Sequence, residues 1–323
     1  MTLFSANELR LAYGHQTLLD GVTVAISAGE KVGLVGRNGC GKTSLLKAAR
    51  GFMDRDTGEI YFQGERVFNK SEKLVPGTKG IAIVHQDFQL EPGYTVYDNI
   101  RHHLIQYQKS YQESKTEEII NICRLQSIRN KTSKELSGGQ KQKVALAKAI
   151  IEEPPLLLLD EPFSNLDNIS KTEFKAILKN IVEKLEIGLL FVTHDSRDAL
   201  TFSDEILIIQ NGKLLKKGTS YELTKRPPSK YAAQLLGLVN IFKGKALNNS
   251  FNTNYNEKKD YWLPQSALKI KKGKQFQIIE EQYLGNEFEY LLFDKNLKIT
   301  FKSNIRLTQK TYNLEIYEPV LIG

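Results

Sequence analysis

The segment 36–43 has residue types and a spacing suited to binding phosphate groups. It matches the pattern G-x-x-x-x-G-K-[ST], whose glycines let consecutive backbone N–H groups converge on a β-phosphate where a Cβ would intrude. Lys42 would bring a positive charge to the β- and γ-phosphates, and the Thr43 hydroxyl would ligate Mg²⁺. The pattern predicts a nucleotide-phosphate site made of Gly36, Arg37, Asn38, Gly39, Cys40, Gly41, Lys42, Thr43 and Ser44.

Two further motifs follow this loop along the chain. Leu136-Ser137-Gly138-Gly139-Gln140 stands at the start of an expected helix, and the apolar run 156–159 is closed by Asp160 and Glu161. Many nucleotide enzymes have a phosphate loop and an acidic strand end, but very few place Ser-Gly-Gly-Gln between them. In this order the three motifs resemble the ATP-binding cassette of ABC transporters.

The resemblance implies roles for the two acids. Asp160 would hold Mg²⁺ through water, as the acid at the end of this strand does in the family. Glu161 would lie beside the γ-phosphate, where a base can orient and deprotonate water. The alternative is that Glu161 is an ordinary acidic strand end. The implied activity is Mg²⁺-dependent ATP hydrolysis, with ATP and Mg²⁺ as the bound cofactors.

Four single positions also match the family. Tyr13 matches the aromatic residue that stacks on adenine, with a strand tyrosine of no special role as the alternative. Gln86 matches the glutamine that reaches Mg²⁺ and senses the membrane partner. Asp167 matches the loop that communicates across a dimer. His194 matches the switch histidine that contacts the γ-phosphate, and it joins Glu161 in the expected catalytic pair.

The motif at Ser137 implies a second copy of the cassette. Two cassettes pack head to tail in ABC proteins, so Ser137, Gly138, Gly139 and Gln140 would meet the γ-phosphate held by the other copy. ATP binding should then drive dimerisation, and hydrolysis should release the dimer. In the following helix, Lys143 and Lys148 depart from the usual arginines, which retains charge but removes planar, bidentate hydrogen bonding.

Apolar periodicity indicates the elements that position these residues. Lys31–Val35 reads as a buried strand that runs into the glycine loop, and Lys42–Arg50 reads as the helix after it. Helices are expected at 96–111, 116–125 and 139–152, which fits the helical subdomain (about 87–150) of ABC ATPases. The runs 156–159 and 189–192 have the continuous apolar character of central parallel strands.

The expected fold is therefore an α/β P-loop NTPase of the ABC type, with a mixed sheet core, an antiparallel β subdomain and a helical subdomain. The composition shifts near Asn240: residues 243–260 are polar, and short β-like segments recur beyond them, at 275–279, 288–293, 297–301 and 312–317. We predict a nucleotide-binding domain over 1–240 and a small C-terminal β-barrel, OB-like or TOBE-like, over 241–323.

The C-terminal half carries the resemblance to one class of transporter. Residues 193–200 resemble the "THD…EAL" stretch of importer ATPases, 236–240 resemble their junction with a TOBE domain, and Tyr283-Leu284-Gly285 is similar to a turn in that domain. Leu263-Pro264-Gln265 departs from the usual Arg-Pro-Glu. The implied function is to energise solute import, of the sugar, polyamine, ferric-iron or anion type, through partner membrane subunits.

Two alternatives stay open, an exporter ATPase and a soluble ribosome-associated ABC factor. Residues 32–39 of this chain also resemble the phosphate loop of such soluble factors. The implied partners are a second ABC ATPase (the same chain or another), integral membrane permease subunits and, indirectly, an external solute-binding protein. The solute, the membrane subunits and the regulatory role of the C-terminal domain are not encoded here. Co-purification with membrane subunits or with ribosomes would separate these classes.

Composition agrees with a cytoplasmic protein peripheral to the membrane. No apolar run approaches the roughly 20 residues that span a bilayer, and the N-terminus lacks the pattern of a signal peptide. The net charge of +8 would suit an anionic partner, but the cluster Lys269, Lys271, Lys272 and Lys274, near an expected turn at Gly273, lies in no RNA-binding motif. We expect a solvated basic surface and no nucleic-acid partner. Cys40 and Cys123 fit neither a disulfide framework nor a metal site.

Overall fold

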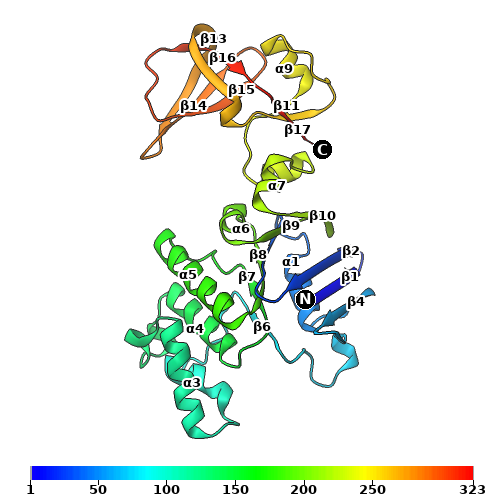
Figure 1. The fold of residues 1–323 in the computed structure, drawn as a ribbon, viewed down its shortest axis with the longest axis vertical. Coiled ribbons are helices and arrows are strands. Elements are labelled where there is room, and N and C mark those ends of the chain that lie inside the picture. The colour runs from blue at the N-terminus through cyan, green and yellow to red at the C-terminus, as the bar shows by residue number, and fades with distance from the viewer. Residues whose placement is uncertain (1, 323) are drawn as a thin grey trace. The chain divides into compact units, whose positions relative to one another are not determined.

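A computed structural model describes residues 2–322 of the chain (Figure 1). The fold divides into two compact units, residues 1–220 and 221–323. The division falls at the start of α7 (Ser220–Lys225), and α8 (Lys230–Leu235) follows in the second unit. The sequence prediction places the boundary at 240/241, after the motif that resembles a domain junction. Because α7 and α8 make more of their contacts with the C-terminal unit, the division places both helices there. The assignment of 1–240 as the nucleotide-binding domain stays a prediction.

The first unit is organised around a six-stranded sheet with the strand order β10-β9-β3-β8-β7-β6. Five of its strands run parallel, and β10 pairs antiparallel with β9. The strands are β3 (Lys31–Val35), β6 (Ile81–Val84), β7 (Leu156–Asp160), β8 (Gly188–Thr193), β9 (Glu205–Gln210) and β10 (Lys213–Gly218). All six residues of β8 are buried, as expected when both faces of a parallel sheet are covered.

A second, antiparallel sheet of order β2-β1-β4-β5 covers one face. Its strands are β1 (Thr2–Tyr13), β2 (Gln16–Ser27), β4 (Thr57–Phe62) and β5 (Glu65–Arg66). Helix α1 (Lys42–Arg50) contributes Leu45 and Leu46 to one apolar core with both sheets. Leu156 and Leu158 join this core, while Leu157 and Leu159 are buried without belonging to it. The apolar run therefore has a buried side chain at every position because each face of the sheet has its own cover.

Helices form the rest of this unit, and Figure 1 shows α3, α4 and α5 on the opposite side of β6 and β7 from the blue strands β1, β2 and β4. Six helical elements lie between β6 and β7. In chain order they are α2 (Val96–Arg101), η2 (His102–Leu104), α3 (Lys109–Ile122), η3 (Gln126–Ile128), η4 (Ser133–Glu135) and α4 (Gly138–Ile150). The remaining helical elements are η1 (Lys70–Glu72), α5 (Asn168–Leu185) and α6 (Ser196–Phe202). The helical subdomain expected from the sequence is this insertion.

The expected single helix over 96–111 is wrong, because α2 ends at Arg101 and α3 begins only at Lys109. No glycine or proline marks the break, so the usual sequence signals for a helix end are missing. The break is stabilised locally: the Tyr107 N–H donates to the Leu104 carbonyl, and the Gln112 side chain donates to the Tyr107 carbonyl. Side-chain hydrogen bonds of this kind are not visible in apolar periodicity.

The second unit contains two antiparallel sheets around a core of its own. One has the order β11-β12-β17 and the other β15-β14-β13-β16. The elements are β11 (Ile241–Lys243), α9 (Gly244–Phe251), β12 (Asp260–Trp262), η5 (Gln265–Ala267), β13 (Leu268–Tyr283), β14 (Phe288–Phe293), β15 (Lys298–Ser303), β16 (Thr311–Ile316) and β17 (Val320–Leu321). These strands fit the small β domain expected from the sequence.

The turn expected at Gly273 is wrong. Gly273 lies inside β13, where the pairing with β16 shifts register so that Lys272 and Phe276 both face Tyr312. The extra residues form an irregularity held by Asn313, whose Oδ1 accepts from the backbone N–H groups of Lys274 and Gln275. A glycine within a strand marks such a bulge as readily as it marks a turn.

Within residues 2–322, no helix is both long and apolar enough to cross a membrane.

Candidate nucleotide site

Four neighbouring parallel strands of the first unit end at one edge of the sheet, and the predicted site residues follow them. The glycine loop follows β3, Gln86 follows β6, Glu161 follows β7 and His194 follows β8. These strands are adjacent in the order β3-β8-β7-β6. Because the carboxyl ends of parallel strands meet at the same edge, ligands of open α/β sheets bind there.

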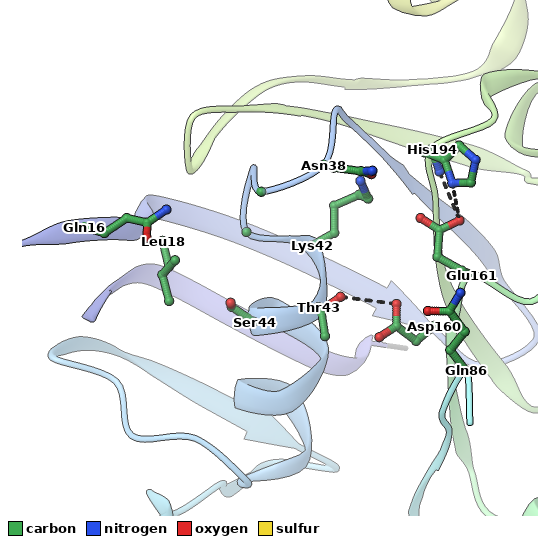
Figure 2. A pocket seen from close by; sticks show the side chains of 12 residues that line it. Gln16, Leu18, Asn38, Lys42, Thr43, Ser44, Gln86, Asp160, Glu161 and His194 are labelled. Atoms are coloured by element: carbon green, nitrogen blue, oxygen red, sulfur yellow. Dashed lines mark hydrogen bonds and ion pairs between the residues drawn. The ribbon is translucent and has the colours of Figure 1, made fainter. Parts of the chain in front are cut away.

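A cavity of about 420 Å³ opens at this edge (Figure 2). Ten of the residues that line it were predicted from the sequence: Asn38, Gly39, Gly41, Lys42, Thr43, Ser44, Gln86, Asp160, Glu161 and His194. Two others, Gln16 and Leu18, were missed. Figure 2 shows these two at the end of the cavity away from Glu161 and His194.

The glycines of the loop are required by close approach. A Cβ on Gly41, whose φ is +101°, would lie 2.1 Å from the Leu18 carbonyl oxygen. A Cβ on Gly36 would lie 2.5 Å from Cys40 Sγ and 2.7 Å from the Ile209 carbonyl oxygen. The loop can therefore follow this path only with glycine at both positions.

Lys42 is 7% exposed and points back into the loop. Its Nζ donates to the Gly36 carbonyl at 2.6 Å and to the Arg37 carbonyl at 3.2 Å. A buried ammonium group that is held only by neutral carbonyls suits an anionic ligand, which would supply charge-assisted hydrogen bonds instead. Thr43 and Ser44 follow in the first turn of α1, whose N-terminus is itself favourable for phosphate.

Asp160 and Thr43 are in direct contact in the lining of the cavity. Thr43 Oγ1 donates to Asp160 Oδ1 at 3.3 Å, and Gln86 lines the same space (Figure 2). Burial raises the pKa of the Asp160 carboxyl, and the Thr43 hydrogen bond and nearby cations lower it by less. A partly buried carboxylate beside hydroxyl and amide oxygens is a donor set that fits Mg²⁺.

Glu161 and His194 form a pair on the same side of the cavity as Asp160 (Figure 2). His194 Nδ1 lies 2.8 Å from Glu161 Oε2, and the His194 backbone N–H donates to the same oxygen at 3.3 Å. Glu161 has a φ of +52°, a left-handed conformation that costs a non-glycine residue on the order of 1–3 kcal/mol. The turn is held by hydrogen bonds, from the Glu161 N–H to the Val192 carbonyl and from Ser164 to the Glu161 carbonyl. Strain of this kind is typical of functional positions.

Nine predicted residues lie outside the cavity lining: Tyr13, Gly36, Arg37, Cys40, Ser137, Gly138, Gly139, Gln140 and Asp167. Gly36 and Arg37 act through their carbonyls on Lys42, and the buried Cys40 is a small side chain within the turn. Tyr13 is 78% exposed at the end of β1, paired with Gln16 across the hairpin. This pairing was the signal that could have placed Gln16 at the rim.

Ser137 and Asp167 begin two neighbouring helices. Ser137 caps α4 in a reciprocal arrangement with Gln140, and Asp167 Oδ1 accepts from the N–H groups of Ile169 and Ser170 in α5. The Ser170 backbone hydrogen bond holds the pKa of Asp167 below its ordinary value. Ser137, Gly138 and Asp167 are exposed, so this surface is open to a second molecule.

The two lysines that depart from the family pattern are both bonded. Lys143 Nζ lies 2.7 Å from Glu173 Oε2 in α5, and Lys148 Nζ donates to the Gln89 carbonyl at 2.7 Å. Each makes a single contact rather than the planar pair of an arginine. Lys148 thereby ties α4 to the loop that carries Gln86.

Comparison with known proteins decides the family. The ABC transporter family model matches residues 19–164. Over 238 residues the chain is 36% identical to the glucose import ATP-binding protein GlcV of Saccharolobus solfataricus, covering 73% of this chain and 67% of that protein. The chain belongs to the ABC transporter ATPases. As an ABC ATPase it binds and hydrolyses ATP to energise transport.

Solved structures share the fold of this ABC ATPase. A dimeric bacterial ABC transporter cassette is 25% identical and superposes with a TM-score of 0.59, covering 67% of this chain and 98% of that one. The cbiO1 protein from Clostridium perfringens, part of the transporter complex cbiONQ, is 24% identical with a TM-score of 0.63, covering 69% of this chain and 90% of that one.

Proposed function

We propose that this ABC ATPase energises import of a solute by cycling between an open pair and an ATP-closed dimer. The observation that carries the ATPase part is the convergence of Lys42, Asp160, Glu161 and His194 on one cavity. Import is supported by the resemblance of residues 193–200 and 236–240 to importer ATPases and by the relative GlcV, whose name assigns it to glucose import.

The glycine loop would hold the triphosphate of ATP. Backbone N–H groups of the loop and the Lys42 ammonium would contact the β- and γ-phosphates, and the base would extend toward Gln16 and Leu18 at the far end of the cavity. Thr43, Gln86 and Asp160 would hold Mg²⁺, which when bound neutralises phosphate charge. Tyr13, which pairs with Gln16 across the hairpin, would stack on adenine.

Hydrolysis would need a water beside the γ-phosphate and a group to take its proton. Glu161 would act as that base, since its carboxylate lies in the cavity next to the loop. His194 contacts the same carboxylate and also lines the cavity, so it would orient Glu161 and contact the γ-phosphate. This assigns catalysis to Glu161 and His194.

Two copies would complete each site. The exposed N-terminus of α4, with Ser137, Gly138, Gly139 and Gln140, would face the γ-phosphate of the partner copy, and Asp167 would lie at the same contact. A helix N-terminus is worth about 0.3–2 kcal/mol to an anion, depending on burial. A cassette of similar fold is dimeric in its solved structure, which supports this arrangement.

The further partners would be integral membrane subunits, reached from the cytoplasmic face, with an external solute-binding protein acting through them. An exporter ATPase or a ribosome-associated factor would make different complexes. We therefore propose isolating the native complex by an affinity tag: membrane permease subunits are expected, and ribosomes would contradict the proposal.

The direction of transport needs a second measurement. The complex is reconstituted in vesicles, and its ATPase rate is measured with and without a solute-binding protein on the outer side. Stimulation by that protein is expected of an importer. A complex with no binding-protein dependence that expels solute would show an exporter instead.

A further inference from the structure

Four charged side chains behind the site form a cluster that the chemistry above does not use. They are Lys171 and Lys175 in α5 and Asp195 and Asp198 at the start of α6, hereafter the Asp198 cluster. Lys171 Nζ lies 3.3 Å from Asp198 Oδ2, and Lys175 Nζ lies 3.0 Å from Asp198 Oδ1. Lys171 Nζ is also 3.7 Å from Asp195 Oδ2.

Because the cluster is largely buried, the loss of one of its ion pairs should have a large energetic effect. Asp198 is 4% exposed, and the two lysine side chains are mostly covered. A buried carboxylate that loses its partners is strongly destabilised, in contrast to an exposed ion pair. Lys171 also lies in the first turns of α5, where the helix dipole disfavours a cation. Its position is therefore explained by the two aspartates and not by helix stability.

The cluster joins two loops of the proposed site, residues 161–167 between β7 and α5 and residues 194–195 between β8 and α6. Asp195 directly follows His194, and α5 begins directly after Asp167. Lys175 Nζ lies 5.1 Å from the centre of the Phe163 ring, two residues after Glu161. Phe163 packs edge-on against Phe191 of β8 and Phe202 of α6, so the Glu161 turn and the His194 turn share one aromatic support.

We infer that the Asp198 cluster is a positioning device, which keeps the His194 turn and the Asp167 loop in one arrangement relative to Glu161. The inference rests on the function proposed above. The cluster lies outside the cavity lining, so it acts through His194 and Asp167 and not on ATP. Loss of its charge balance should slow turnover while leaving ATP binding by Lys42 and Thr43 unchanged.

The test is Asp198→Asn, which keeps the side-chain volume and removes the charge. We expect kcat to fall about tenfold, with the KM for ATP changed by less than about twofold. Asp198→Glu, which restores the charge, should recover most of the rate. Glu183→Gln is the matched control, because it makes the same acid-to-amide change in an exposed ion pair of α5, with Lys179 at 3.8 Å.

The rates are expressed per molecule that binds ATP, so a loss of folded protein does not count as a loss of turnover. A normal kcat in Asp198→Asn with a lower melting temperature would overturn the inference, because the cluster would then be purely structural. If Asp198→Asn does not fold, Lys171→Met gives the same two outcomes, since Lys175 still pairs with Asp198 in that variant.

Glu161→Gln is measured in parallel. A normal kcat in Asp198→Asn beside a large loss in Glu161→Gln would overturn the positioning role and leave the proposed function standing. A normal kcat in both would overturn both.

Discussion

Lys42 shows at the residue scale how the loop is prepared for phosphate. Its ammonium group is buried and donates hydrogen bonds to two carbonyl oxygens of the loop. Thr43 and Asp160, two of the residues that would hold Mg²⁺, are in direct hydrogen-bond contact. The strands and the loop hold these side chains in fixed positions, which reduces the entropic cost of binding a ligand.

The exposed Tyr13 gives a prediction at this scale. Tyr13→Ala should weaken ATP binding about 5- to 160-fold, because aromatic stacking on a base contributes about 1–3 kcal/mol. Tyr13→Trp should bind normally. Binding is measured by fluorescence titration, with Tyr221→Ala, an exposed tyrosine of the second unit, as the control. Unchanged affinity in Tyr13→Ala would remove Tyr13 from the site.

Cys123 gives a prediction about pH. Burial raises the pKa of its thiol from an ordinary value of 9.0 to about 12. The unfolded chain therefore loses this proton first as the pH rises above 9, and the free energy of unfolding falls by about 1.4 kcal/mol per pH unit from this group. The contribution is fully present below pH 9. Urea titrations at pH 8 and pH 10 should show a smaller loss of stability in Cys123→Ala than in the parent; equal losses would contradict it.

At the element scale, strand ends and helix starts supply nearly all of the site. The sequence predicts those elements that carry strong local signals: α1 and β14 have the bounds expected from it. It does not predict the break between α2 and α3, which depends on side-chain hydrogen bonds, or the placement of Gln16, which depends on the hairpin register with Tyr13. The ion pairs of Asp198 also join residues distant in the chain. Motif residues could be predicted because local backbone geometry restricts their type, whereas side-chain hydrogen bonds, hairpin register and ion pairs between distant residues depend on the folded structure.

The N-terminus of α4 carries the prediction about the composite site. Ser137→Arg should leave ATP binding by one copy nearly unchanged and abolish ATP-driven dimerisation, because a bulky cation would obstruct closure onto the partner. Ser229→Arg is the matched control, since Ser229 also caps a helix and its hydroxyl accepts from the Ala232 N–H. Light scattering with and without ATP is the measurement. An ATP-dependent dimer of Ser137→Arg would disprove the contact in trans.

At the scale of the whole molecule, the two units have separate cores. All residues that line the nucleotide cavity lie in the first unit. The second unit, with its antiparallel sheets, is the part expected to act in regulation or in contacts between copies.

A chain ending at Leu238 should therefore still bind ATP. Its dissociation constant for ATP should be within about tenfold of that of the full chain. Loss of one contact that contributes about 1.4 kcal/mol would change the dissociation constant by this factor. Isothermal titration on both chains measures it, with circular dichroism to confirm folding. Weaker binding by a folded truncated chain would show that the C-terminal unit takes part in the nucleotide site.

The most direct test of the central claim is the Glu161→Gln substitution. The amide keeps the volume of the side chain and can still hold a water, but it does not accept a proton at neutral pH. The rate of ATP hydrolysis should fall about 10²- to 10⁴-fold, while the phosphate loop keeps its affinity. Size-exclusion chromatography with Mg²⁺ and ATP should then show an ATP-bound dimer, and Lys42→Ala should remain without nucleotide. A Glu161→Gln protein that hydrolyses ATP within about threefold of the parent rate and stays monomeric would contradict the account.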